Sequence, residues 1–307
     1  MMSELLLVVN PRSAGGATGR RWQEIESRLR RQIGVPFDVV FTQHASHATL
    51  LAREGASRYD CVVAVGGDGT INEVVNGLVD ERGPLRPELR LGIIPRGTGA
   101  DFVRTLGIPH NLEGAAARLA QGNVREVDIA KVSFHDFSGR DTVRFFINEG
   151  EIGLGAATCQ AVNRSSKRLG PRLTYVWCTL VAMARYRARW VTLTLDGEEP
   201  RRIRLSNAWL ANGQYSGSGI HMAPRARPDD GLLDVVALAQ AGPIQSAARL
   251  RKLRSGAFVN EPGVTYTTAR RIEAHSEHTV LIEVDGEPIG TLPATFEITG
   301  QRLKVVC

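Results

Sequence analysis

The chain has 307 residues, 43% of them hydrophobic and 23% charged, which allows one or two packed domains and excludes wholesale disorder. Its formal net charge is +6, yet only four of its 38 basic residues are lysines, and none of the four precedes Lys131. The four cysteines include no C-x-x-C pair, which excludes a zinc framework and a disulfide scaffold and is typical of a reducing cytosol.

The first 126 residues alternate between short apolar runs and helical patterns. Strands are expected at 5–9, 37–41, 61–65 and 91–94, and helices at 18–31, 44–55 and after residue 70. Trp22, Ile25 and Leu29 fall on one stripe of the first helix. This β-loop-α alternation predicts a parallel, Rossmann-like sheet with helices on both faces.

The remainder of the chain is dominated by strand-like segments separated by turns. These are 127–134, 143–147, 190–195, 203–212, 233–238, 264–268, 278–284 and 294–299. Helical patterns interrupt them at 156–187 and 244–253. We therefore expect an α/β domain at 1–126 and a mainly antiparallel β domain at 127–297, with about residues 298–307 packing back on the first domain.

Three small-residue loops follow predicted strands of the first domain, at 10–16, 66–72 and 97–99. Loops at the carboxyl ends of parallel strands converge on one crevice, and glycines let main-chain N–H groups approach an anion. We therefore expect a polyphosphate site. Because the domain lacks lysine, a P-loop site and a protein-kinase site are excluded. The domain also lacks a G-x-G-x-x-G motif with an acidic residue after the next strand, which argues against a dinucleotide-dependent dehydrogenase.

Asp68 stands between Gly67 and Gly69 in the middle loop. A carboxylate beside phosphate-binding amides is typical of a site where Mg²⁺ lies between them. The alternative is that Asp68 only caps the helix that follows it.

The segment Gly66-Gly67-Asp68-Gly69-Thr70-Ile71-Asn72-Glu73 closely resembles the signature of the diacylglycerol kinase catalytic domain family, which includes bacterial soluble-type lipid kinases and the sphingosine and ceramide kinases. Further similarities occur in the same order along nearly the whole chain. They are Asn10-Pro11-Arg12-Ser13, Thr42 with His47-Ala48, Gly97-Thr98-Gly99-Ala100-Asp101-Phe102, Asn148 with Gly153 and Gly155, Asp229 to Asp234, and Asp285-Gly286-Glu287.

The resemblance implies a nucleotide-binding α/β domain, a β-sandwich-like domain and an active site in the cleft. It also implies an enzyme that transfers the γ-phosphate of ATP to a lipid hydroxyl. Carried over by position, the residues implied to bind ATP are Asn10, Pro11, Arg12, Ser13, Ala14, Thr42, Gly66, Gly67, Asp68, Gly69, Thr70, Ile71, Asn72, Gly97 and Thr98.

The resemblance assigns catalysis to Asp285 and Glu287, one of which is the general base, together with Asp68. The alternative for Asp285-Gly286 is a plain type I′ hairpin tip. Asp196-Gly197-Glu198 has the same tripeptide without a family match, and we interpret it as an ordinary hairpin.

A structural Mg²⁺ is likewise implied by the resemblance, held by the Asp230 carboxylate and the carbonyls of Arg227 and Leu232, with Asp101 linking it to Asp68 through water. Oxygen-only ligands suit Mg²⁺, although this segment could also be a simple turn. Two departures from the family pattern are Ala100, where asparagine is usual, and the acidic Glu149-Gly150-Glu151.

Residues 152–195 contain seven basic and no acidic residues, together with aromatic and aliphatic ones. This pattern is typical of contact with an anionic membrane surface, and basic residues at 249–254 extend it. The alternative is a core-facing helix pair with a solvated basic face. We see no base-reading module and expect no nucleic acid partner.

Together these patterns predict an ATP- and Mg²⁺-dependent lipid kinase, with diacylglycerol as the expected substrate. The apolar run at 5–9 is too short for a signal peptide, and the longest mostly apolar stretch has about ten residues, against about 20 for a spanning helix. We therefore expect a cytoplasmic protein that associates peripherally with membranes. Two alternative functions remain at this point, a soluble-substrate kinase resembling NAD kinase and a non-catalytic nucleotide-binding regulator. A homodimer remains an alternative to a monomer.

Overall fold

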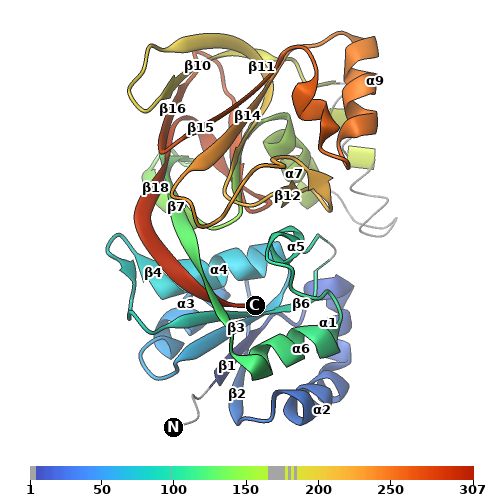
Figure 1. Cartoon of the computed structure of the whole chain (residues 1–307), viewed down its shortest axis with the longest axis vertical. Helices are drawn as coiled ribbons and strands as arrows, with labels where there is room; N and C mark the ends of the chain where they lie inside the picture. The colour runs from blue at the N-terminus through green and yellow to red at the C-terminus, as the bar shows by residue number, and fades with distance from the viewer. Residues whose placement is uncertain (1–4, 98, 165–176, 179–180, 183–184) are drawn as a thin grey trace. The chain divides into compact units, whose positions relative to one another are not determined.

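The structure is a computed structural model that describes residues 5–97, 99–164, 177–178, 181–182 and 185–307 (Figure 1). The chain divides into two compact units, the first formed by 1–129 with 299–307 and the second by 130–298. It passes between them twice, within β7 (Val124–Asp136) and within β18 (Glu287–Val306). The protein is thus a two-domain α/β protein with a β-rich second part.

The first unit is built on a parallel sheet in the order β2, β1, β3, β6. These strands are Phe37–Phe41, Leu5–Val9, Cys61–Gly66 and Arg90–Pro95. All residues of β1 and β3 are buried because helices cover the sheet, which explains their continuous aliphatic sequences. The end of β18 joins the sheet beside β6, with Lys304 opposite Arg90.

Some helices of the first unit begin and end close to the residues that the sequence predicts, and others do not. The helices are α1 (Ala17–Arg20), α2 (Trp22–Ile33), α3 (His47–Gly55), α4 (Asp68–Leu78), α5 (Asp101–Thr105) and α6 (Leu112–Gln121), with a 3-10 turn at Ser13–Gly16. Trp22, Ile25 and Leu29 are buried along α2, as predicted. A Cβ on Gly77 of α4 would collide with the carbonyl of Thr49, so this glycine allows α3 and α4 to pack closely.

Two helix predictions are wrong at their starts. The single helix predicted at 18–31 is broken at Arg21, because Gly19 donates its N–H to the carbonyl of Pro11 and the first turn follows the loop. The helix predicted from residue 44 begins at His47, because Ser46 has a positive φ of 63°. Its first N–H groups are held by the carboxylate of Glu73 instead.

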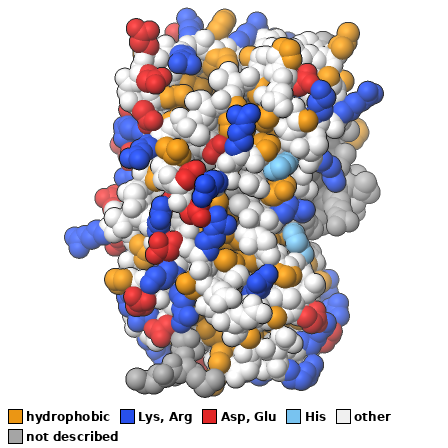
Figure 2. Space-filling model, in the orientation of Figure 1, with side chains coloured by type: hydrophobic (Ala, Val, Ile, Leu, Met, Phe, Trp, Pro, Cys, Tyr) orange, Lys and Arg blue, Asp and Glu red, His pale blue; other side chains and the backbone are white. Residues whose placement is uncertain are grey.

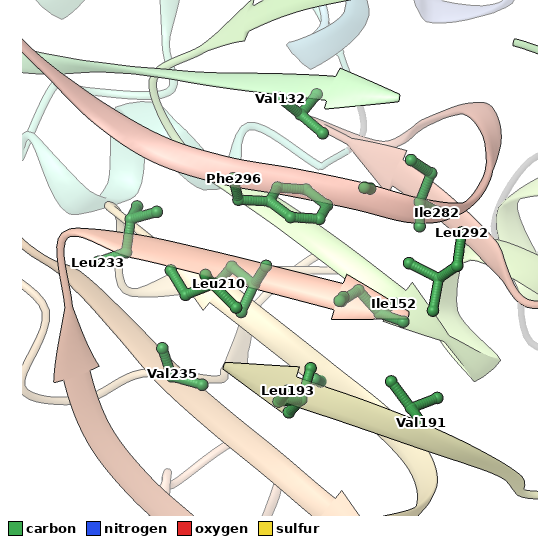
Figure 3. Packing of buried hydrophobic residues seen from close by; sticks show 14 of the residues in the cluster. Val132, Ile152, Val191, Leu193, Leu210, Leu233, Val235, Ile282, Leu292 and Phe296 are labelled. Atoms are coloured by element: carbon green, nitrogen blue, oxygen red, sulfur yellow. The ribbon is translucent and has the colours of Figure 1, made fainter. Parts of the chain in front are cut away.

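The second unit is mainly antiparallel β structure. Its strands are β8 (Asp141–Phe146), β9 (Glu149–Gly153), β10 (Arg189–Leu195), β11 (Arg201–Ala211), β12 (Tyr215–Ser216), β13 (Ile220–His221), β14 (Leu233–Ala239), β15 (Val264–Ala269), β16 (Arg271–His275) and β17 (Leu281–Val284). Its main core gathers aliphatic side chains around Phe296, as Figure 3 shows, including Ile152 of β9 and Ile282 of β17. This packing fixes the position of β9 and β17 relative to each other.

Four strands of this unit were not predicted, β9, β16 and the two-residue β12 and β13, and β17 starts at Leu281 rather than at 278. β9 has the sequence Glu-Gly-Glu-Ile-Gly, in which only the isoleucine favours a strand. It is a strand because β11 and β17 pair with it on both sides. Of the helix predicted at 156–187, the structure gives α7 (Leu154–Arg164), and most of the remainder lies outside the described residues.

The helix predicted at 244–253 is confirmed as α9 (Pro243–Lys252), which is followed by a 3-10 turn at Ala257–Asn260. Among the described residues, no helix combines the length and the apolar character needed to cross a bilayer.

Candidate active site

The loop after β1 is tied to the loop after β3 by Asn10. The Asn10 main-chain N–H donates to the carbonyl of Val65 at 3.0 Å, and its Nδ2 donates to Thr70 Oγ1 at 3.0 Å. Its Oδ1 accepts the N–H of Arg12 at 2.9 Å. The predicted residues Asn10 and Thr70 therefore lie together, and one side chain organises both loops.

Ala14, Gly15 and Gly16 continue the first loop with positive φ angles of 51°, 64° and 82°. The Ser13 hydroxyl is hydrogen bonded to the Asn10 carbonyl at 2.9 Å and to Thr18 Oγ1 of α1 at 2.7 Å. Main-chain and hydroxyl groups thus determine the conformation of this loop.

The loops after β3 and β6 touch each other backbone to backbone. A Cβ on Gly97 would lie 2.6 Å from the Cα of Gly67, and a Cβ on Gly67 would lie 3.3 Å from the Cα of Gly97. The Arg96 N–H donates to the carbonyl of Gly66 at 2.7 Å, and a Cβ on Gly66 would collide with the side chain of Thr70. Gly97 is required by space because a Cβ there would meet the backbone of the other loop, and Gly66 because a Cβ there would meet Thr70.

Asp68 connects the same two loops through its carboxylate. Its Oδ2 accepts the N–H of Ala100 at 2.9 Å and its Oδ1 accepts the N–H of Asp101 at 3.1 Å. Burial raises the pKa of this carboxyl, while the main-chain hydrogen bonds oppose the rise. Asp68 therefore caps the start of α5, whereas α4, the helix that begins at Asp68 itself, has no side-chain cap. The alternative that Asp68 caps the next helix is wrong.

Ala100 adopts the left-handed conformation, with φ 52° and ψ 43°, and is 3% exposed. Asparagine and glycine tolerate this conformation better than alanine. The structure therefore gives a backbone reason for the asparagine that is usual at this position of the family pattern.

Replacing Ala100 with glycine is expected to raise the free energy of unfolding by about 0.5–1 kcal/mol. A left-handed alanine costs about 1–2 kcal/mol, and the greater chain entropy of glycine returns about 0.5–1 kcal/mol of that gain. Urea denaturation measures the change. The control is Ala56→Gly, at a buried right-handed position with φ −57°, which should lose stability; a loss for both variants would contradict the strain at Ala100.

The remaining predicted nucleotide residues have mixed surroundings. Thr42 follows β2 and donates its N–H to the carbonyl of Val9 at 2.9 Å. Ile71 and Asn72 lie in α4 with buried side chains, and the Ile71 N–H donates to the carbonyl of Gly67 at 3.1 Å. Thr98 lies outside the described residues. Glu73, which the sequence analysis did not single out, caps α3 and helps to fix the loop that follows β2.

In the second unit, Asp285 and Gly286 form the turn between β17 and β18, with φ angles of 47° and 82°. This is the hairpin that the sequence allowed as an alternative. However, Asp285 is only 5% exposed, and its Oδ1 accepts the N–H groups of Asn148 at 3.2 Å and Glu149 at 3.0 Å. Its own N–H donates to the carbonyl of Glu149 at 3.0 Å. The turn is a hairpin tip that holds a buried carboxylate.

Asp196 provides an internal comparison. It has φ 50°, is followed by Gly197 at φ 78°, and accepts the N–H groups of Arg270 and Arg271. The turn joins β10 to β11, so its prediction as a hairpin is confirmed. Its side chain is exposed, unlike that of Asp285, and burial rather than turn geometry distinguishes the two aspartates.

Two further predicted residues are neighbours of Asp285, Glu287 in the sequence and Asn148 through the hydrogen bond that its N–H donates. Glu287 forms an ion pair with Arg144 at 3.0 Å. Asn148 donates its Nδ2 to the carbonyl of Tyr215 at 3.1 Å, and the Tyr215 ring stacks on His221. These contacts fix the segment that donates hydrogen bonds to Asp285.

Asp230 lies in an exposed turn and accepts the N–H of Leu232 at 3.1 Å, while Arg227 pairs with Asp229 at 3.7 Å. Nearby, burial raises the pKa of Asp234 to about 6, and the charge of Asp230 contributes to this rise. Asp234 is hydrogen bonded to Tyr266. Carboxylate and carbonyl oxygens are therefore present at this turn, which is the donor set that Mg²⁺ prefers.

The second unit also contains a group of three buried carboxyls, which the sequence analysis predicted only in part. Glu149, Glu151 and Glu283 are buried, and one oxygen from each lies within 4.8 Å of the others. The sequence analysis noted the first two as departures from the family pattern and did not identify Glu283, whose partner is distant in sequence. Only the pairing of β9 with β17 brings these groups together.

Comparison with known families gives two matches that follow each other along the chain. The family model for the diacylglycerol kinase catalytic domain matches residues 4–132. The model for the YegS C-terminal NAD kinase beta sandwich-like domain matches residues 150–307.

Similar individual proteins cover almost the entire chain. A diacylglycerol kinase of Bacillus subtilis is 29% identical over 308 residues, which is 99% of this chain and 96% of the relative. One of Staphylococcus haemolyticus is 29% identical over 302 residues, or 97% and 86%. A crystal structure from Bacillus anthracis, described as a candidate diacylglycerol kinase, matches with a TM-score of 0.77 at 27% identity and covers 99% of this chain and 96% of that one.

Proposed function

The chain belongs to the diacylglycerol kinase catalytic domain family and is a lipid kinase, and we propose that it transfers the γ-phosphate of ATP to the hydroxyl of diacylglycerol, giving phosphatidic acid. The observation that carries this choice of substrate is the similarity to curated diacylglycerol kinases over 97–99% of the chain. Both parts of the chain are included in that similarity, so it is not limited to a shared nucleotide domain.

In this proposal, ATP binds to the loops after β1, β2, β3 and β6, at Asn10–Ala14, Thr42, Gly66–Asn72, Gly97 and Thr98. The close backbone contact between Gly67 and Gly97 fits a phosphate group, because main-chain N–H groups are accessible where no side chain intervenes. No lysine precedes residue 131, so main-chain donors are assigned the role that a lysine has in P-loop enzymes. Magnesium, when bound, neutralises charge on the phosphate oxygens.

Asp285 is proposed as the general base that accepts the proton of the lipid hydroxyl. Two main-chain N–H groups orient its carboxylate, and the left-handed turn holds it at the end of two strands. Glu287 is restrained by Arg144 and is the alternative base. Asp68 is proposed to orient the phosphate loops, since it bonds to the N–H groups of Ala100 and Asp101.

A structural Mg²⁺ is proposed at Asp230 with the carbonyls of Arg227 and Leu232. The donor set fits the ion, and the turn already brings the Asp230 carboxylate to the main chain of Leu232. A cation here would also offset the negative charge that Asp230 and Asp234 present to each other.

Contact with an anionic membrane surface is proposed for 152–195 and for α9. In the described part of 152–195, Trp177 and Trp190 are exposed, while Lys167, Arg168, Arg172 and most of the apolar residues around them lie outside it. On α9, Ile244 is 89% exposed, and Figure 2 shows basic and hydrophobic side chains side by side over this helix. Exposed apolar and basic groups together suit an anionic lipid surface.

The basic cluster at 249–254 is smaller than the sequence indicates. Arg249 is buried and donates to the carbonyls of Ala239 and Pro262, and Lys252 pairs with Glu261. Arg251 and Arg254 are exposed and are the residues of this cluster that we assign to lipid contact.

Incubating the protein with labelled ATP, Mg²⁺ and vesicles made from a total lipid extract tests the proposal. We expect labelled phosphatidic acid, formed faster on vesicles containing anionic lipid than on neutral ones with the same diacylglycerol content. A parallel reaction contains NAD in place of lipid. Labelled NADP with no labelled lipid would contradict the proposed substrate, and equal rates on both kinds of vesicle would contradict the membrane contact.

A further inference from the structure

Two buried carboxyl groups lie directly opposite each other next to the Asp285 turn. Glu151 of β9 and Glu283 of β17 are register partners in an antiparallel pair and are 5% and 1% exposed. In the described part of the chain, neither carboxyl forms an ion pair with a lysine or arginine. Two opposed negative charges would destabilise the strand pairing, and burying them without a partner would be costly.

The surroundings of the pair supply hydrogen bonds rather than positive charge. The two glutamates are hydrogen bonded to each other, and Asn207 of β11 donates its Nδ2 to Glu151 Oε1 at 2.5 Å. Cys159 of α7 is hydrogen bonded to Glu283. A Cβ on Gly155 would collide with the Glu151 carboxylate, so the side chain is closely enclosed.

We propose that Glu151 and Glu283 share one proton and act as a positioning pair for Asp285. In this arrangement Glu283 carries the proton and donates it to the carboxylate of Glu151, so the pair has one negative charge instead of two. Its role in catalysis rests on the proposed function, in which Asp285 is the general base.

The connection from the pair to Asp285 is short. Glu283 lies opposite Glu151 and Val284 lies opposite Gly150, and the next contact along the two strands is the hydrogen bond from the Asp285 N–H to the Glu149 carbonyl. Glu149 and its neighbour Asn148 then donate to the Asp285 carboxylate. Repulsion that separated β9 from β17 at this register would therefore displace both donors of the base.

The pKa values of both carboxyls in the pair are raised. Burial raises the pKa of Glu151 to about 7 and that of Glu283 well above its ordinary value of 4.5, and the charges of Glu151 and Asp285 raise the latter further. The other groups facing the pair are Glu149 on β9, the Cys159 thiol on α7, the neutral Asn207 on β11, and Tyr186. Burial raises the pKa of the Cys159 thiol well above its usual value and that of Tyr186 to about 12, which keeps both neutral near pH 7.

Stability should follow from these shifts. The folded chain keeps protons on the pair at pH values where the unfolded chain has released them. The stabilisation is complete below about pH 4.5, and it is lost as the pH rises through about 7, the pKa of Glu151, and through the raised pKa of Glu283.

Glu283→Gln tests the pair because the amide donates to Glu151 as the shared proton does, yet cannot ionise. For the wild type we expect kcat to fall about tenfold per pH unit once the pH rises past the raised pKa of Glu283 and the shared proton leaves, with little change in ATP affinity. The variant should lose this alkaline decline, and its melting temperature should depend less on pH between 4.5 and 9. Glu283→Ala should lower kcat at least tenfold, and glutamine should restore it.

The matched control is Glu273→Gln, an exposed glutamate on β16, which should keep the wild-type pH profile. Equal alkaline declines in wild type and Glu283→Gln would overturn the proposal. A rise in wild-type melting temperature on adding Mn²⁺ at pH 8, absent in Glu283→Gln, would also overturn it, because a cation would then take the place of the proton among the three glutamates. The melting curves need no lipid kinase activity, so the pair can be tested even where the proposed substrate fails.

Discussion

Replacing Asp285 with asparagine is expected to lower the rate of lipid phosphorylation about 10²- to 10⁴-fold, the range attributed to general base catalysis. Asparagine has the same shape, and its side-chain oxygen still accepts the N–H groups of Asn148 and Glu149. The turn should therefore keep its structure, while the group that accepts the hydroxyl proton is lost. Measurement of kcat on diacylglycerol vesicles, with ATP affinity measured separately by calorimetry, checks both parts.

Asp196→Asn is the matched control for Asp285→Asn. Asp196 has the same left-handed turn, the same following glycine and the same acceptance of two main-chain N–H groups, but it is exposed. We expect this variant to retain full activity. Unchanged turnover in Asp285→Asn, with Glu287→Gln inactive, would transfer the role of base to Glu287.

The comparison of these two aspartates also shows where the sequence is informative and where it is not. Asp-Gly between two strand patterns predicts the hairpin in both cases, because the positive φ angles of the turn favour those residues. Burial of Asp285 depends on Asn148 and Glu149, which precede it by more than 130 positions. Only the family resemblance, and not the local pattern, separated the two before the structure did.

The strands also differ in how far the sequence predicts them. The aliphatic runs that form β1 and β3 predict buried strands, because they contain no polar side chain. β9 is polar and glycine-rich, and it forms a strand only because its neighbours on both sides provide partners. For the same reason the Glu151 and Glu283 pair could not be predicted, as neither residue carries a signal for the other.

Asp68 illustrates a residue whose location was predicted and whose contacts were not. The glycines around it indicated a loop at the end of a strand, and the structure places it there. The N–H groups that donate to its carboxylate lie 32 and 33 positions away, at the start of α5. The carboxylate therefore joins two loops, which a search for caps within the next helix does not reveal.

Gly97→Ala is expected to reduce ATP affinity at least tenfold and to lower the free energy of unfolding by about 1–3 kcal/mol, the usual cost of forcing extra volume into a packed site. The new Cβ would lie 2.6 Å from the Cα of Gly67. Because that neighbour is backbone, it cannot rotate away, and the loops after β3 and β6 must separate. Thermal unfolding and calorimetric titration with ATP give the two quantities.

A graded series distinguishes this steric explanation from a general sensitivity to losing glycine. At Gly67 the added Cβ would lie 3.3 Å from the Cα of Gly97, so Gly67→Ala should weaken ATP binding less than Gly97→Ala. Gly242 has open space around its Cβ position and a φ of −70°, so Gly242→Ala should leave ATP binding unchanged. Equal ATP affinity in all three variants would remove the loops after β3 and β6 from the phosphate site. The expected order would instead support main-chain groups as the phosphate ligands in a domain that has no lysine.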